Sequence, residues 1–179
     1  LDEAAKRVLY EKTNVKDVYL EQLYTFGDPN RYPGSRVITV SYFALIRSED
    51  LILQAEEGLN IQRIEWQPVY NLPEMAFDHH DILTYALKRL RARLEYTPVA
   101  FQLLPVKFTL TELQRSYELV LNTGIDKRNF RKKILSLGIL EEYDEYTKDS
   151  SKRPARLYGF NPNSIEGRRG LMSSAISKR

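Results

Sequence analysis

Apolar residues between positions 109 and 138 recur at the three- and four-residue spacing of two amphipathic helices. Thr109 and Glu112 occupy the two positions of a capping box, which predicts a helix from about Thr109 to Leu121. A second helix is predicted from Asp126, which can cap the first turn, to Gly138, which can adopt a left-handed conformation after the last turn. A short turn containing glycine joins them, so the segment is predicted to be a helix-turn-helix.

The second predicted helix has one apolar stripe and an otherwise basic surface. Phe130, Ile134 and Leu137 share the apolar face. No acidic residue follows the cap, and the other faces carry Lys127, Arg128, Arg131, Lys132 and Lys133. An isolated basic cluster usually means only a solvated surface, but the neighbouring elements favour a binding role here.

Two β-rich segments, 138–143 and 154–160, follow this helix and are predicted to form a hairpin. The polar connection between them carries Lys148, Lys152 and Arg153. A helix-turn-helix followed by a two-stranded wing predicts a winged helix, whose basic helix would enter a DNA major groove while the wing neutralises phosphates. A winged helix that binds another protein is the alternative.

The first half of the chain alternates helix and strand patterns. A helix is predicted from Leu1 to about Asn14, and because it opens without a cap we expect that a segment preceded Leu1 in the cell. Strands are predicted over 18–26 and 36–46, the second being nearly all apolar and therefore expected to be central. The polar loop that joins them could close over an anionic ligand or could be a solvated hairpin end.

A third strand is predicted over 61–69, from its alternation, and a helix from Asp78 to about Glu95. His79 and His80 open this helix beside two aspartates. Adjacent helical residues point in different directions, so a role at the helix start is favoured over a metal site.

The net charge of +3 conceals an asymmetry. Residues 1–99 contain 12 basic and 15 acidic residues, net −3, whereas residues 100–179 contain 15 basic and 9 acidic residues, net +6. This division fits a sensor domain joined to a domain that binds a polyanion. Cysteine is absent, which excludes disulfides and thiolate sites, and no apolar run reaches membrane-spanning length, so a cytoplasmic protein is expected.

The segment from Arg7 to Val15 resembles the second half of a Nudix box, the motif whose glutamates bind Mg²⁺ or Mn²⁺ beside a pyrophosphate. Arg7, Leu9, Glu11 and Val15 match the motif; the departures are Val8 and Lys12 at two glutamate positions and Asn14 at the glycine. Hard cations need several oxygen ligands, so a catalytic metal is not expected here. We therefore expect no catalytic residue, no bound metal and no required cofactor.

Several further segments resemble the Nudix-related transcriptional regulators in the same order, among them Leu20–Pro29, Arg36–Tyr42, Tyr96–Phe101, Phe108–Gln114 and Asp126–Lys132. The resemblance implies an α+β protein: a Nudix-like α/β/α sandwich, here without its N-terminal part, followed by a winged helix-turn-helix domain. It also implies a homodimeric bacterial repressor of NAD biosynthesis or salvage genes that binds a palindromic operator in double-stranded DNA and is released by ADP-ribose.

The resemblance places the effector beside the box and the following strands, at Arg7, Glu11, Phe26, Arg31, Arg36 and Asp78. The basic helix and wing supply the predicted DNA contacts, which are Lys127, Arg128, Asn129, Arg131, Lys132, Lys152, Arg153 and Arg156. The expected domains are 1–97 for effector sensing, 98–165 for DNA binding, and a flexible basic tail over 166–179. A regulator that responds to a pentose and an active ADP-ribose pyrophosphatase remain alternatives.

Overall fold

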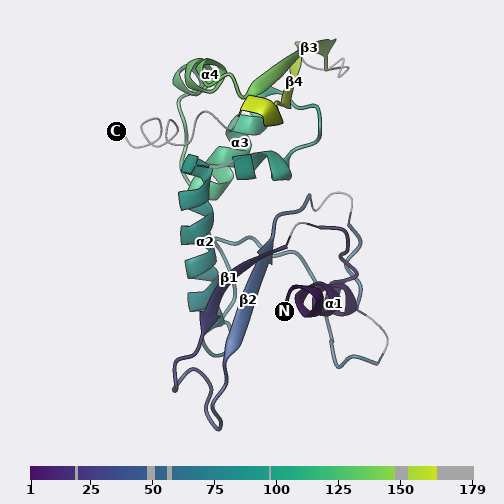
Figure 1. The fold of residues 1–179 in the computed structure, drawn as a ribbon, viewed down its shortest axis with the longest axis vertical. Coiled ribbons are helices and arrows are strands. Elements are labelled where there is room, and N and C mark those ends of the chain that lie inside the picture. Colours follow the sequence, from purple (N-terminus) through teal and green to yellow (C-terminus); the bar gives the residue numbers. More distant parts are fainter. Residues whose placement is uncertain (19, 48–50, 56–57, 97, 148–152, 165–179) are drawn as a thin grey trace. The chain divides into compact units, whose positions relative to one another are not determined.

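The chain divides into two compact units, Leu1–Arg89 and Leu90–Arg179 (Figure 1). The structure is a computed structural model, and it describes residues 1–18, 20–47, 51–55, 58–96, 98–147 and 153–164. The boundary between the units falls inside helix α2, His79–Tyr96. Within the described residues no helix is both long and apolar enough to cross a membrane.

The first unit begins with helix α1, Asp2–Thr13, as the hydrophobic pattern predicts. Asn14 closes this helix in the left-handed conformation (φ 60°), and its amide donates to the Tyr10 carbonyl at 2.7 Å. Val15, the next residue, is buried. The Tyr42 hydroxyl donates to the Asp2 carboxylate at 2.6 Å, which ties the helix to the neighbouring sheet.

That sheet consists of two antiparallel strands, β1 (Leu20–Phe26) and β2 (Thr39–Ala44). The register pairs Leu20 with Ala44 and Phe26 with Thr39, with an irregularity between Gln22 and Tyr24. Among the described residues β2 pairs with β1 alone, so the expected central position of β2 is not found there.

The strand expected over 61–69 is wrong, because the structure has no helix or strand at these residues. Trp66 is 52% exposed and Val69 is exposed as well. Alternating apolar residues form a strand only where a neighbouring strand can take up the backbone hydrogen bonds. In the described part of this unit, residues 61–69 pair with neither β1 nor β2.

The second unit contains the predicted helix-turn-helix. Helix α3, Leu110–Leu121, starts with the predicted capping box, in which the Thr109 side chain accepts from the Glu112 amide and Glu112 accepts from the Thr109 amide. Helix α4, Lys127–Ser136, follows after a turn. Gly138 lies just beyond α4 with φ +60°, the conformation for which glycine is suited.

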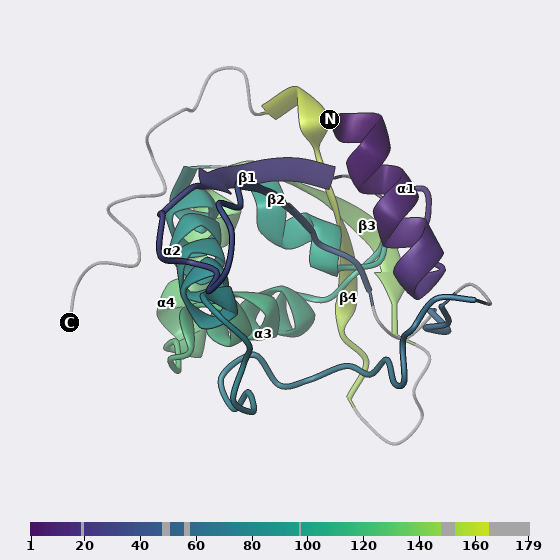
Figure 2. The same cartoon turned by 90° about the horizontal axis from the view of Figure 1, so that it is seen from below.

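A hairpin follows α4, formed by β3 (Leu140–Tyr146) and β4 (Arg156–Phe160), which lie side by side in both views (Figures 1 and 2). Strand β3 extends three residues beyond its predicted end at Tyr143. The two strands pair in antiparallel register from Leu140 opposite Phe160 to Tyr146 opposite Arg156. A bridge between Phe108 and Tyr158 adds the segment before α3 to the free edge of β4.

The core of the second unit joins both helices to the hairpin. Two short 3-10 helices, η2 (Pro98–Leu103) and η3 (Pro162–Ser164), flank the fold. Phe101 packs against Phe108 and Phe160, with ring centroids 5.6 and 4.6 Å apart. The buried apolar residues include Leu94, Phe108, Leu113, Tyr117, Val120, Phe130, Ile134, Leu137 and Ile139. This core is what holds α4 and the hairpin in place.

Candidate functional site

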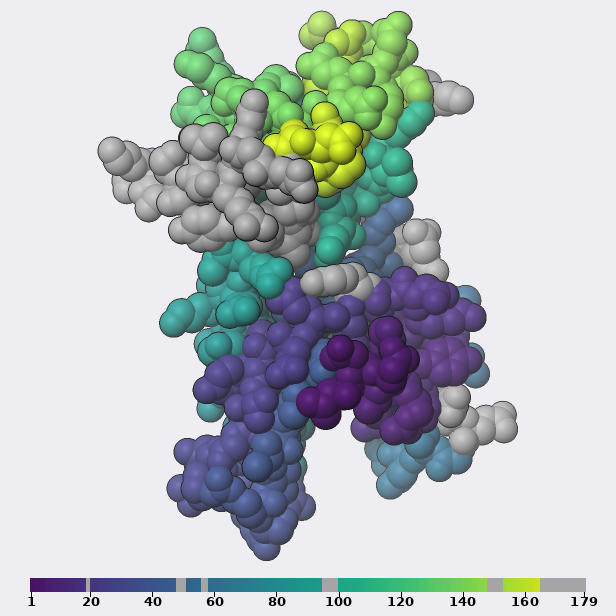
Figure 3. Space-filling model, viewed as in Figure 1, coloured from purple at the N-terminus to yellow at the C-terminus, as the bar shows by residue number. Residues whose placement is uncertain are grey.

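Helix α4 presents a positive surface because its apolar residues are anchored in the core. Phe130 and Ile134 are buried, and the Phe130 ring lies 5.4 Å from that of Tyr117 in α3. The Asp126 carboxylate accepts a hydrogen bond from the Asn129 amide at 2.8 Å and so fixes the first turn. Side chains of α4 and the hairpin reach the surface of this unit (Figure 3), and the exposed residues of α4 include Lys127, Arg128, Asn129 and Lys132.

A carboxylate near the end of α3 fixes the turn between the helices, and the sequence pattern did not reveal it. Glu118 accepts from the Ile125 amide at 2.9 Å and from Gln114 Nε2 at 3.0 Å. Gln114 Nε2 also donates to the Ile125 carbonyl at 2.9 Å. The Ile125 amide, followed by Gln114, lowers the pKa of Glu118 by favouring its ionised form. The i,i+4 spacing of Gln114 and Glu118 just before a turn was the available signal.

Arg131 lies differently from the other basic residues of α4. Its side chain is half-buried, and Nη2 donates to Thr111 Oγ1 of α3 at 3.3 Å. Its Nε atom is buried and has no hydrogen-bond partner among the described residues. A buried charged donor without a partner is costly, so this atom marks a place where an acceptor is expected.

A cleft of about 570 Å³ opens beside Arg131. The start of α3, helix α4 and the start of β4 form its walls. Lining residues are Thr109, Leu110, Thr111, Lys127, Arg131, Arg153, Pro154, Ala155, Arg156 and Tyr158. Four of these carry a positive charge and none carries a negative charge, so the cleft favours an anion.

In the wing, which is the hairpin of β3 and β4, Arg156 on β4 is bound by two residues of β3. Arg156 Nη1 donates to Glu142 at 2.9 Å, and Arg156 Nη2 donates to the Tyr146 hydroxyl at 3.3 Å. These contacts hold β4 to β3 and reduce the net positive charge that Arg156 contributes. Arg153 is exposed at the edge of the cleft, and the predicted contact Lys152 lies outside the described residues.

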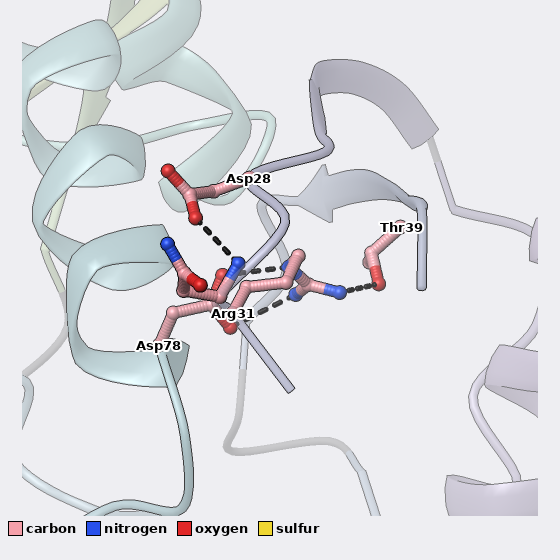
Figure 4. A network of polar contacts seen from close by, with 5 residues as sticks. Asp28, Arg31, Thr39 and Asp78 are labelled. Carbon is pink, nitrogen blue, oxygen red and sulfur yellow. Dashed lines mark hydrogen bonds and ion pairs between the residues drawn. The ribbon is translucent and has the colours of Figure 1, made fainter. Parts of the chain in front are cut away.

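In the first unit the structure brings together two of the predicted effector residues, Arg31 and Asp78 (Figure 4). Arg31 Nε and Nη2 donate to the two carboxylate oxygens of Asp78, each at 2.8 Å, while Nη1 donates to Thr39 Oγ1 at 2.6 Å. The Arg31 side chain is only 6% exposed. The hydrogen bonds from Arg31, and then its positive charge, lower the pKa of Asp78.

The other predicted effector residues make their contacts elsewhere in the first unit. Arg7 Nη1 and Glu11 Oε1 form an ion pair at 2.7 Å along α1. Phe26 ends β1 and packs edge-on against Tyr85 at 5.8 Å, and Arg36 is exposed in the loop after it. Within the described residues no hydrogen bond or ion pair joins Arg7 or Glu11 to Arg31 or Asp78.

The Nudix-like segment offers few oxygen ligands in the part of the chain that the structure describes. Glu11 is the one carboxylate at the matched box positions, and Arg7 already binds it. Lys12, at a glutamate position of the motif, is exposed on the same helix. No group of three or more metal-ligating side chains occurs among the described residues.

An exposed cluster of aromatic rings beside the Arg31–Asp78 pair was not anticipated from the sequence. The rings of Tyr32 and Phe77 lie 4.9 Å apart, and that of His79 lies 6.1 Å from Phe77. Phe77 is 56% exposed and has φ 53°, a conformation that bulky residues rarely adopt. The Arg31–Asp78 bonds hold these rings together, because Tyr32 follows Arg31 and Phe77 precedes Asp78.

Sequence comparison identifies relatives for both units. The family model described as the NrtR DNA-binding winged helix domain matches residues 100–160. The ADPR responsive transcriptional repressor NtrR of Acinetobacter baylyi is 39% identical over 156 residues. The match covers 87% of this chain and 62% of the relative, so the chain spans less than two thirds of that protein's length.

Comparison with solved structures also identifies NrtR and Nudix proteins as similar to this chain. Shewanella oneidensis NrtR is 30% identical with a TM-score of 0.69, and the match covers 90% of this chain and 73% of that one. The same protein complexed with a 27mer DNA matches with a TM-score of 0.66 at 29% identity, over 89% of this chain and 72% of that one. A MutT/nudix family protein from Enterococcus faecalis matches with a TM-score of 0.62 at 26% identity, over 88% of this chain and 68% of that one.

Proposed function

Because the chain belongs to the NrtR family, we propose that it is a transcriptional repressor that binds operator DNA through the winged helix of its second unit. The observation that carries this proposal is the surface of α4. Lys127, Arg128, Asn129 and Lys132 are exposed on a helix whose opposite side is fixed in the core by Phe130 and Ile134. A rigid helix of this kind fits a DNA major groove, where its basic side chains meet phosphates and base edges.

The comparisons support a nucleic-acid partner. The Shewanella relative has been crystallised with a 27mer DNA, and the family model that matches residues 100–160 is named for DNA binding. In this chain Arg128, Asn129 and Lys132 are the proposed contacts to bases or phosphates, and Lys152 and Arg153 of the wing the proposed phosphate contacts. Arg156 has the additional task of joining the two strands of the wing through Glu142.

For the effector we propose ADP-ribose, sensed by the first unit. The Acinetobacter relative is named as ADPR responsive. The site would use Arg7, Glu11, Phe26, Arg36 and the Arg31–Asp78 pair. Three N–H groups of Arg31 are already engaged, so we assign Arg31 to holding the loop in place rather than to direct capture of a phosphate. A pentose is the alternative effector.

We further propose that the first unit has no pyrophosphatase activity. Val8 and Lys12 replace two metal-binding glutamates, and Glu11 is paired with Arg7. Incubation of the protein with ADP-ribose and millimolar Mg²⁺ or Mn²⁺ should release no AMP. Metal-dependent AMP release that is lost in Glu11→Gln would contradict this proposal and favour a hydrolase.

The biological unit that we propose is a homodimer on a palindromic site, because two-fold proteins match two-fold operators. The proposed division of labour assigns residues 1–97 to effector sensing, 98–165 to DNA binding and 166–179 to a basic tail. Its proposed targets are genes of NAD synthesis or salvage. A repressor of such genes would act in the cytoplasm, where the chromosome lies.

Fluorescence anisotropy with DNA from the gene neighbourhood, across a salt series, tests the function. We expect specific binding that ADP-ribose abolishes and L-arabinose does not. Arg128→Ala should weaken operator binding without unfolding the protein, while Lys88→Ala, which removes one exposed positive charge from the first unit, should not.

Three outcomes would change the proposal. Release by L-arabinose alone would move the protein to carbohydrate control. Unchanged affinity and salt dependence in Arg128→Ala would show that α4 is not the helix that binds the operator. Little binding to any DNA, even at low salt, would favour a winged helix that binds a protein partner.

A further inference from the structure

The basic residues of α4 fall into two stripes with different surroundings. Lys127 and Arg131, four residues apart, both line the cleft beside the wing. Arg128 and Lys132, also four residues apart, are exposed and do not line it. Residues four apart on a helix share a face, so the two pairs point in different directions. One helix therefore offers two distinct positive surfaces.

We propose that the cleft holds one phosphate group of the DNA backbone, with Arg131 as its main ligand, while Arg128 and Lys132 face the bases. This proposal rests on the proposed DNA-binding function and assigns separate tasks within that interface. Arg131 is then a positioning residue that sets the register of α4 in the groove and carries no sequence information itself.

The first argument comes from the hydrogen bonds of the Arg131 guanidinium. Thr111 Oγ1 accepts from Nη2 at 3.3 Å and orients the group, while Nε is buried without a partner among the described residues. Arg131 lines the cleft, and an Arg fork matches two phosphate oxygens, so an anion held there would bind the guanidinium. Lys and Thr side chains on the same walls could bind its remaining oxygens.

The charge pattern at the start of α4 is the second argument. Lys127 and Arg128 occupy its first turn, and no acidic residue lies in that turn. Positive charge there opposes the helix dipole, which favours anions near the N-terminus. The Asp126 cap offsets this only in part. A local sequence that breaks a stability rule is expected where function requires it, and a phosphate beside Lys127 would satisfy both groups.

The walls of the cleft give the third argument. Arg153 and Arg156 approach from the wing, while Thr109, Leu110 and Thr111 come from the start of α3. Arg156 is held by Glu142 and Tyr146, so Arg131, Lys127 and Arg153 are left as the main cations facing the cleft. Three structural elements thus meet at the cleft, and a DNA backbone phosphate bound there would link the wing to α4.

A backbone scan tests the proposal with the full chain. Each operator phosphate is replaced in turn by an uncharged methylphosphonate, and affinity is measured for the unaltered protein, for Arg131→Ala and for Arg128→Ala. We expect one phosphate per half-site whose neutralisation weakens the unaltered protein about tenfold and has little further effect on Arg131→Ala. Arg128→Ala should remain fully sensitive at that position.

Salt dependence gives a second readout. Arg131→Ala should weaken specific and non-specific duplexes by a similar factor and reduce the slope of log K against log salt by about one. Arg128→Ala should lose more on the operator than on non-specific DNA. Arg131→Lys, which keeps the charge without the fork, should recover the slope but only part of the affinity. Circular dichroism of each variant confirms that it is folded.

Two results would overturn the proposal. One is that Arg131→Ala and phosphate neutralisation weaken binding additively at every position. The other is that Arg131→Ala weakens binding to the specific operator alone. If the protein bound no DNA at all, the proposed function would fail first. An NMR titration of the Arg131 Nε–H signal with inorganic phosphate would then test the cleft by itself. A saturable shift that Thr111→Ala weakens would support a phosphate site that serves a small phosphate, and no shift would remove it.

Discussion

Arg31 and Asp78, 47 positions apart in the chain, form a two-pronged ion pair with both hydrogen bonds at 2.8 Å. Arg31 lies in the loop between β1 and β2, and Asp78 immediately precedes α2. The pair therefore fixes the loop to the start of that helix, and Thr39 at the beginning of β2 completes the network. The exposed rings of Tyr32 and Phe77 are held against each other as a result.

Asp78→Asn should destabilise the first unit and remove part of its acid sensitivity. The pKa of Asp78 is lowered by Arg31. A carboxyl group whose pKa is lower in the folded state contributes stability that is complete above its unfolded pKa of about 4 and is lost as pH falls through the folded pKa. Thermal unfolding from neutral to strongly acidic pH should show the curves of protein and variant converging at low pH.

The exposed Glu74, in the same unit, supplies a control for this change. Glu74→Gln removes a carboxylate from the surface and should leave the stability of this unit at neutral pH unchanged. A constant offset between the Asp78→Asn and unaltered curves at all pH values would show that the ionisation of Asp78 does not contribute to the acid dependence.

Tyr117→Phe should leave the free energy of unfolding unchanged or raise it by about 1 kcal/mol. The Tyr117 hydroxyl is buried and has no hydrogen-bond partner among the described residues, and burial raises its pKa. Phenylalanine keeps the ring packed at 5.4 Å against Phe130 and removes the unpaired group. Tyr117→Ala, which leaves a cavity, should instead cost about 3–5 kcal/mol in urea denaturation. A clear loss of stability in Tyr117→Phe would reveal a partner for the hydroxyl.

Gly159→Ala should distort the wing. A β-carbon at this position would lie 2.6 Å from the Tyr143 hydroxyl oxygen and 2.8 Å from Tyr143 Cε2, so the ring must move at a cost of about 1–3 kcal/mol. Gly124→Ala is the matched control, because no atom lies within 4 Å of the added carbon there. In a Tyr143→Ala background the Gly159→Ala cost should shrink, and an undiminished cost would place its origin in the backbone.

Glu118→Ala should weaken DNA binding more than Glu118→Gln does. Alanine removes both hydrogen bonds that the side chain accepts, from the Ile125 amide and from Gln114, so α4 loses its fixed orientation to α3. Glutamine keeps an acceptor for the Ile125 amide. Anisotropy on operator DNA and denaturation should rank the variants in this order. Equal binding by both variants would show that core packing alone orients α4.

Most of the second unit was predictable from the sequence because its signals are local. The Thr109 and Asp126 caps, the apolar stripe of Phe130 and Ile134 and the glycine after α4 each act within a few residues of themselves. Hydrogen bonds within one turn and side chains on one helical face depend little on the rest of the chain. The hairpin followed from alternation, although β3 runs three residues further than predicted.

Features that depend on partners far away in the chain could not be predicted before the fold was known. The alternation at 61–69 resembles that of a strand, but a strand also needs a paired neighbour, and these residues pair with neither β1 nor β2. The resemblance to the Nudix-related regulators marked Arg31 and Asp78 as candidate ligands, whereas folding pairs them with each other. The basic residues of α4 could be read directly from the amino-acid sequence. The placement of Thr111 and the wing beside it separates Arg131 in the cleft from exposed Arg128, because burial and partner distance arise only when separate elements pack.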